Sequence, residues 1–280
     1  MLLAHELLGQ QHSPERWLFV LHGILGRRSN WRTFMRKVLE QRPGWGAVLV
    51  DLRMHGDSQG FPAPHTVASA AADLLALRTH VEGEHGGQVA GLIGHSFGGK
   101  VGLAGAAALR RAGASLEELW IIDAPLGPRP DPEDRSTTMV FEVLDGLPPR
   151  FESRRAFTEA VMAAGISQRT AQWLATNVVA VDEGEGGGWR FGLELEHLHA
   201  LIEDFAAVDL WPTLVEQSAA LPIGLVVGGR SKAVFGSERE RAEAEAAAGR
   251  LHLEVIPKAA HWVHVDAPAE LRALLAGPPR

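Results

Sequence analysis

The sequence predicts an α/β protein: a mostly parallel central sheet, helices on both faces of that sheet, and one helical insertion. Three observations support this prediction. Short apolar runs alternate with longer helix-like stretches, the runs have the length of strands buried on both faces, and the alternation is interrupted once, after residue 124. Strands that alternate with helices are typical of a parallel sheet whose crossover helices cover both faces.

Six apolar runs are predicted to be buried strands, because each is short and has Gly, His, Asp or Pro at or next to its end. LAHELLGQ (3–10) is a candidate for an additional edge strand. The six runs are RWLFVLHG (16–23), WGAVLVDL (45–52), GQVAGLIGH (87–95), LEELWIIDA (116–124), PIGLVVGG (222–229) and LHLEVIP (251–257).

Helix-like stretches separate these runs and complete the core, which we assign to residues 1–124 and 213–280. The stretches are 30–41, 66–83, 97–113, 237–249 and 267–277.

The insertion comprises residues 125–212. It begins with the Pro-rich PLGPRPDPEDR and continues with amphipathic helical patterns, a small hairpin predicted over 181–195 and a helix over 197–212. One interpretation is an additional helical layer. We favour a lid, because insertions at this edge of an open α/β sheet flank the site where ligands bind.

Composition excludes several kinds of site. The net charge of −7 and the lack of a basic block argue against nucleic acid or an anionic membrane surface as a partner. The chain has no cysteine, which excludes disulfides, thiolate zinc sites and a cysteine nucleophile. No HExxH pattern, secretory signal or run of 18 apolar residues occurs, so we expect a cytoplasmic protein without a metal, an organic cofactor or a membrane span.

The strongest catalytic signal is LIGHSFGGK (92–100), in which Gly94 to Gly98 fit G-x-S-x-G between a predicted strand and a predicted helix. Such a turn exposes the serine hydroxyl above the sheet, at a helix N-terminus that favours developing negative charge. An incidental serine in a Gly-rich turn is the plain alternative. Ser96 is therefore the candidate nucleophile.

A serine nucleophile needs a base and two oxyanion donors. His261 follows the last predicted strand, where this arrangement places the base, and His264 is its competitor. We expect His22 and His55 to be structural, hydrogen-bonding neighbouring loops. The predicted oxyanion donors are the backbone N–H groups of Phe97, after the nucleophile, and Ile24, in the loop after an early strand, with Leu25 as second choice.

The acid that should orient the base is not in the expected loop, because residues 228–237 contain no carboxylate. Glu238 is predicted to begin a helix. Asp123 ends a strand at the same edge of the sheet as Ser96, and its burial would be costly without a partner. A strand-end carboxylate bound only by backbone N–H groups is the alternative interpretation, and Asp204 and Asp209 remain outside candidates.

These segments together resemble a known family. HGILGRRSNW, DLRMHGDS, GHSFGGK, IIDAP, WRFGLELEHL, VVGGRS and AAHWVHVDAP occur in this order across nearly the whole chain. They are similar to the α/β-hydrolase superfamily's small bacterial carboxylesterases related to the abhydrolase-domain-eleven proteins. The resemblance implies an α/β-hydrolase fold, activity on short to medium acyl esters, and an acid at Asp123. It leaves Arg230 and Ser231 to shape the rim beside His261.

The expected function is hydrolysis of small or medium carboxylic esters through a Ser96–His261–Asp123 triad, with a small ester or thioester as substrate. The same triad would also serve thioesters, carbon–carbon bond hydrolysis or lyase chemistry of the menaquinone-pathway kind. A non-catalytic ligand-binding protein of the same fold is the other alternative. The insertion diverges from the family pattern, so the sequence does not define the acyl or alcohol group, or the oligomeric state.

Overall fold

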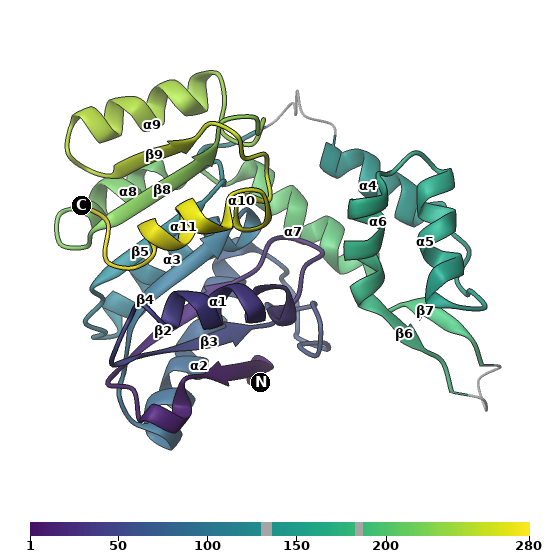
Figure 1. The fold of residues 1–280 in the computed structure, drawn as a ribbon, viewed down its shortest axis with the longest axis horizontal. Coiled ribbons are helices and arrows are strands. Elements are labelled where there is room, and N and C mark those ends of the chain that lie inside the picture. Colours follow the sequence, from purple (N-terminus) through teal and green to yellow (C-terminus); the bar gives the residue numbers. More distant parts are fainter. Residues whose placement is uncertain (130–135, 183–186) are drawn as a thin grey trace.

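The centre of the molecule is a seven-stranded sheet (Figure 1). The computed structural model describes residues 1–129, 136–182 and 187–280. The strands are β1 (His5–Leu8), β2 (Arg16–Leu21), β3 (Trp45–Val50), β4 (Gln88–His95), β5 (Glu118–Ile122), β8 (Ile223–Gly228) and β9 (His252–Ile256). Their order is β1-β3-β2-β4-β5-β8-β9, with β1 antiparallel to β3 and every other pair parallel. The predicted α/β class with a mostly parallel sheet is confirmed, and LAHELLGQ supplies the edge strand β1.

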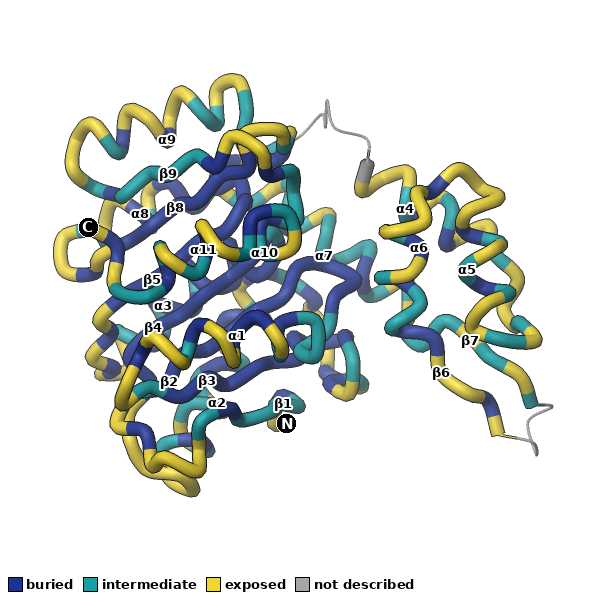
Figure 2. The backbone as a smooth tube through the Cα atoms, viewed as in Figure 1, coloured by how far each residue is buried: buried dark blue, intermediate teal, exposed yellow. Residues whose placement is uncertain are grey.

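The five inner strands bury side chains on both faces of the sheet, because successive residues of a strand point to opposite sides. The edge strand β9 is mostly half-buried, so the prediction of a fully buried strand over 251–257 is wrong in that respect. In β2, Phe19 and Leu21 belong to the core under α2 (Val67–His85), α3 (Phe97–Arg111), α8 (Trp211–Ser218) and α9 (Ser237–Ala247). Leu18 and Val20 belong to a second core under α1 (Arg32–Leu39) and α11 (Pro268–Leu274). Figure 2 shows the inner strands buried between these two layers of helices.

Short helical turns complete the core. They are η1 (Gln10–His12), η2 (Arg28–Trp31) and α10 (Val263–Asp266).

The insertion lies beside the sheet rather than on one of its faces (Figure 1). Its elements are α4 (Ser136–Asp145), α5 (Arg154–Ala163), α6 (Gln168–Leu174), η3 (Ala175–Asn177), β6 (Val178–Ala180), β7 (Trp189–Phe191) and α7 (Leu195–Ala207). Phe157, Val161 and Leu174 are fully buried within it. The two strands pair antiparallel, with Val178 opposite Phe191. β6 lies before 181–195, the range predicted for the hairpin, because α6 already ends at Leu174. The Pro-rich start falls partly on residues 130–135, which are outside the described residues.

Parallel strands bring the segments that follow them to one edge of the sheet, the edge where open α/β sheets bind ligands. Ser96 follows β4, Asp123 follows β5, and the loop that carries His261 follows β9. The insertion leaves the core just after β5 and returns through α7, which contacts both α2 and α3. Among the helices that the structure describes, none is long and apolar enough to cross a membrane.

Candidate active site

Ser96 occupies a strained turn between β4 and α3, with φ 53° and ψ −120°. A positive φ is uncommon for a residue with a side chain and costs about 1–3 kcal/mol, so neighbouring contacts must hold it. Ser96 N–H donates to the carbonyl of Ile122 on β5 (2.9 Å). A Cβ at Gly94 would collide with the carbonyl of Gly98, and one at Gly98 with the carbonyl of His22. The two glycines therefore permit the turn that exposes the serine.

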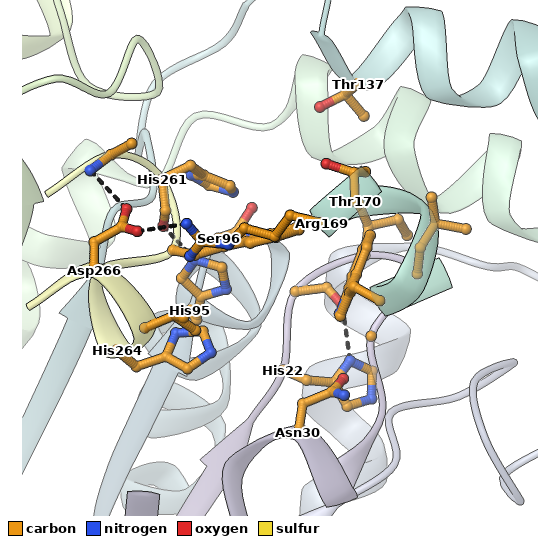
Figure 3. Close-up of a pocket in the computed structure, with 18 of the residues that line it drawn as sticks. His22, Asn30, His95, Ser96, Thr137, Arg169, Thr170, His261, His264 and Asp266 are labelled. Atoms are coloured by element: carbon orange, nitrogen blue, oxygen red, sulfur yellow. Dashed lines mark hydrogen bonds and ion pairs between the residues drawn. The ribbon is translucent and has the colours of Figure 1, made fainter. Parts of the chain in front are cut away.

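The structure brings His261 and Asp123 together. The Nδ1 atom of His261 lies 2.6 Å from Oδ2 of Asp123, although the two residues are 138 positions apart. Asp123 has no exposed surface and adopts a positive φ of 48°. Because Nδ1–H donates to the carboxylate, Nε2 is left to accept a proton, as a general base requires. His261 and Ser96 both line one cavity, where Figure 3 shows them as neighbours.

The loop without a carboxylate binds Asp123 instead. Ser231 Oγ donates to Oδ2 of Asp123 (2.5 Å), and Gly228 N–H donates to Oδ1 (3.0 Å). The expectation that Ser231 shapes the rim is therefore wrong, because its hydroxyl faces inward to the acid. Arg230 is exposed, and its backbone N–H donates to the carbonyl of Ala259 (2.9 Å). The sequence pattern gave no signal for the contact of Ser231, because β5 and β8 are neighbours only in the folded sheet.

The other candidate acids are engaged elsewhere. Glu238 accepts hydrogen bonds from the backbone N–H groups of Leu126 (3.0 Å) and Gly127 (3.2 Å), where the insertion leaves the core. Asp204 accepts from the first residue of α2, Val67 (2.7 Å). Asp209 accepts from the backbone N–H of Trp211 at the start of α8 (3.0 Å).

His264 has a packing role. Its ring stacks on Trp31 with centroids 4.3 Å apart, and burial lowers its pKa to about 4. His95 is also buried, and its Nε2–H donates to the backbone carbonyl of His261 (2.9 Å). Burial, followed by the nearby His261, lowers the pKa of His95 well below its usual value. Neutral His95 and His264 therefore support the loop that carries His261.

Residues 22–26, here called the oxyanion loop, are held by two buried histidines. His22 Nε2 accepts from the N–H of Leu52 (3.1 Å), so its Nδ1–H donates to the carbonyl of Gly23 (2.8 Å). That carbonyl belongs to the same peptide group as the N–H of Ile24, and the two point in opposite directions. Leu25 N–H donates to His55 Nε2 (3.1 Å), so this N–H already has a partner, and Ile24 is the stronger candidate for the oxyanion donor.

Both histidines act as acceptors only when neutral. Burial lowers the pKa of His22 to about 4 and the pKa of His55 to about 3. The second oxyanion candidate, Phe97 N–H, is at the first residue of α3, where helix geometry leaves N–H groups without intrahelical partners.

A cavity of about 540 Å³ opens above Ser96 and is walled by both the core and the insertion. Trp31 and Trp262 line it from the core, and Trp173 lines it from α6. Arg169, also on α6, reaches across to Asp266 of α10 with an ion pair of 2.7 Å (Figure 3). The site can thus take a mostly apolar ligand whose reacting carbon approaches Ser96.

Lys100 of α3 binds both ends of the insertion to the helix that follows Ser96. Its fully buried Nζ donates to the carbonyls of Gly127 (2.9 Å), Phe205 (2.6 Å) and Val208 (2.8 Å). Burial lowers the pKa of Lys100 to about 8. Gly127 is therefore held twice, by Lys100 through its carbonyl and by Glu238 through its N–H.

Metal binding finds no support in the part of the chain that the structure describes, where no three His, Asp or Glu residues form a group that could hold an ion.

Comparison with known proteins gives a consistent result. The model of the alpha/beta hydrolase family matches residues 18–274. The chain is 28% identical to the sn-1-specific diacylglycerol lipase ABHD11 of Danio rerio over 260 residues, covering 90% of this chain and 75% of the lipase. It is 27% identical to Esterase YbfF of Escherichia coli, covering 92% of this chain and 91% of the esterase. The solved structure of a marine microorganism esterase superposes with a TM-score of 0.78 at 20% identity, covering 98% of this chain and 97% of that one.

Proposed function

This chain belongs to the alpha/beta hydrolase family, and from that premise we propose that it hydrolyses carboxylic esters with Ser96 as its nucleophile. The observation that carries the proposal is the contact of 2.6 Å between His261 and the buried Asp123, beside a serine in a strained turn. Esterases and a lipase among the similar proteins support the same type of reaction.

The proposed reaction has two steps. In the first, Ser96 Oγ attacks the ester carbonyl, His261 Nε2 accepts the serine proton and then gives it to the departing alkoxide, and an acyl-enzyme forms. In the second, His261 takes a proton from water as the water oxygen attacks the acyl carbon. It then returns that proton to Ser96 Oγ as the bond between Oγ and the acyl carbon breaks and the carboxylic acid leaves. Asp123 keeps the ring of His261 in the tautomer that both steps require.

Negative charge develops on the former carbonyl oxygen in both steps. The N–H groups of Ile24 and Phe97 are the proposed donors to that oxygen. Each such donor contributes about 100- to 1000-fold to the rate in comparable enzymes, because it is aimed at the charge before the charge appears.

We propose a small or medium acyl group as the part of the substrate that enters the cavity. A volume of about 540 Å³ is within the usual range for small-ligand sites, and Trp31, Trp173 and Trp262 provide apolar walls. We further propose that residues 125–212 act as a lid, because α6 forms one wall of the cavity and Lys100 holds both ends of the insertion against α3.

The decisive experiment compares the wild-type protein with Ser96→Ala on p-nitrophenyl acyl esters of increasing chain length. We expect turnover in the wild type, none above background in Ser96→Ala, and unchanged thermal unfolding. A fluorophosphonate probe should label the wild type covalently and leave Ser96→Ala unlabelled. Full activity in Ser96→Ala would exclude the proposed nucleophile.

The same panel should include the matching thioesters, because the triad could also serve them. If thioesters are turned over faster than esters with the same acyl group, the proposed substrate class is wrong and should be thioesters. The proposal that Ser96 is the nucleophile would be unaffected.

A further inference from the structure

We propose that Asn177, at the end of η3 in the insertion, is a positioning residue for the oxyanion loop. Asn177 donates a hydrogen bond to the carbonyl of Leu25. Through this bond the insertion sets the direction of the N–H group of Ile24, in addition to covering the cavity. The inference rests on the proposed ester hydrolysis, since oxyanion stabilisation matters for acyl transfer.

The oxyanion loop needs support from outside itself. It forms a tight turn in which Gly26 N–H donates to the carbonyl of Gly23 (3.0 Å). Leu25, inside this turn, has a positive φ of 62° and is buried. A leucine in this conformation costs about 1–3 kcal/mol, and the surrounding structure has to hold it.

Three consecutive peptide groups of this loop are each held by one side chain. His22 binds the carbonyl of Gly23, His55 binds the N–H of Leu25, and Asn177 Nδ2 donates to the carbonyl of Leu25 (2.7 Å). The two histidines belong to the core, whereas Asn177 belongs to the insertion, 152 positions from Leu25. The N–H of Ile24 lies in the first of these peptide groups. The direction of this N–H therefore depends on the side chains that hold both ends of the turn, His22 at one end and Asn177 at the other.

The contact made by Asn177 is buried on all sides. Asn177 is 3% exposed, and its Oδ1 atom is buried without a hydrogen-bond partner among the described residues. Water therefore has little access to replace the donor if the amide is removed. A second bond of the same kind lies next to it, because Arg27 Nη1 donates to the carbonyl of Thr176 (2.7 Å). Arg27 directly follows the oxyanion loop, so the insertion binds this stretch of the core through one bond that it donates and one that it accepts.

The same segment also touches the substrate space. Thr170 and Trp173 of α6 line the cavity, and Thr176 Oγ1 donates to the carbonyl of Trp173 (2.7 Å). A well-packed acyl group would fix α6, and η3 continues directly from α6 to Asn177. Binding at the insertion's wall would thereby favour the loop geometry that the transition state needs.

The experiment measures how fast a fluorophosphonate labels Ser96, because that reaction places an oxygen in the oxyanion hole and requires no ester turnover. Asn177→Ala removes the donor, and Asn177→Leu removes it while filling the space. Val161→Ala is the matched control, since Val161 is fully buried in the insertion and does not line the cavity. We expect labelling to slow about 10- to 100-fold in both Asn177 variants, because small displacements of catalytic groups have effects of that size, and to stay within about 2-fold in Val161→Ala.

Two further readouts separate positioning from stability and from the proposed function. Ester hydrolysis should show a lower kcat with little change in KM, and hydrogen exchange in residues 22–31 should be faster in Asn177→Ala than in Val161→Ala. Labelling and exchange rates equal to those of the control would overturn the inference. A wild-type protein that is labelled but hydrolyses no ester would refute the substrate class, while the comparison of labelling rates would still test Asn177.

Discussion

Replacing Ser231 by alanine tests the support of the candidate acid. Ser231 Oγ donates to Oδ2 of Asp123 (2.5 Å), the same oxygen that receives the Nδ1–H of His261 (2.6 Å). Ser231 Oγ also accepts from the N–H of Ala233 (3.1 Å). Among the described residues, the carboxylate in Ser231→Ala keeps two donors, Nδ1–H of His261 and the N–H of Gly228. Asp123 has no exposed surface at which solvent could replace the lost hydroxyl.

The size of the effect follows from those contacts. A hydrogen bond to a charged group contributes about 1.5–3 kcal/mol, and about 1.4 kcal/mol corresponds to a tenfold change in rate. Two of the three donors to Asp123 remain, so we expect only part of this free energy to be lost from the transition state. The prediction is a kcat about tenfold lower in Ser231→Ala, with KM nearly unchanged and a loss of about 2 kcal/mol in the free energy of unfolding.

The assay is steady-state hydrolysis of a p-nitrophenyl ester, together with denaturant unfolding. Ser58→Ala is the matched control, because the hydroxyl of Ser58 also makes one bond as a donor and one as an acceptor. Ser58 Oγ donates to the carbonyl of Asp51 (2.7 Å) and accepts from the N–H of Ala4 (2.8 Å). Ser231→Thr keeps the hydroxyl and should retain most of the activity. A wild-type kcat in Ser231→Ala, or an equal fall of kcat in Ser58→Ala, would refute the reasoning.

Two other predictions concern the acid and the ends of the insertion. Asp123→Asn should lower kcat by about 1000- to 10,000-fold, whereas Glu238→Gln should change it less than about 3-fold; the reverse order of effects would identify Glu238 as the acid. Lys100 has its pKa lowered to about 8 from 10.5, so between these pH values the unfolded chain holds a proton that the folded chain has released. The free energy of unfolding of the wild type should therefore rise with pH relative to that of Lys100→Met, by about 3 kcal/mol across the interval. Denaturant titrations below pH 8 and near pH 10.5 check this, and a difference that is constant with pH contradicts it.

Much of the core could be predicted from local patterns. The six apolar runs from RWLFVLHG to LHLEVIP all became strands. The five inner ones are buried, since parallel strands under two layers of helices need apolar side chains on both faces, whereas β9 lies at the edge of the sheet and is mostly half-buried. The glycines around Ser96 indicated a sharp turn, and the structure has one there because neither glycine leaves room for a Cβ. Asp123 was singled out by the cost of burying a lone carboxylate at a strand end, and in the structure it is completely buried against His261.

Other features had no signal in the sequence. Ser231, Asn177 and Lys100 each contact residues more than 100 positions away, and nothing in their immediate neighbours indicates the partner. The hairpin in the insertion begins before the predicted range 181–195, because α6 ends at Leu174 and β6 already starts at Val178.

The sequence by itself thus determined the alternation of strands and helices, the turn at Ser96 and the selection of Asp123 as the candidate acid, because backbone preference, periodic burial and the cost of a buried charge act locally. Only the tertiary structure decided which groups hold the acid and the oxyanion loop. The strand order β4-β5-β8-β9 brings the loop after β8 against the end of β5, so a segment without a carboxylate supplies the donors that the carboxylate needs. The packing of the insertion against the core brings Asn177 to Leu25, and that contact depends on the whole fold rather than on any short stretch of chain.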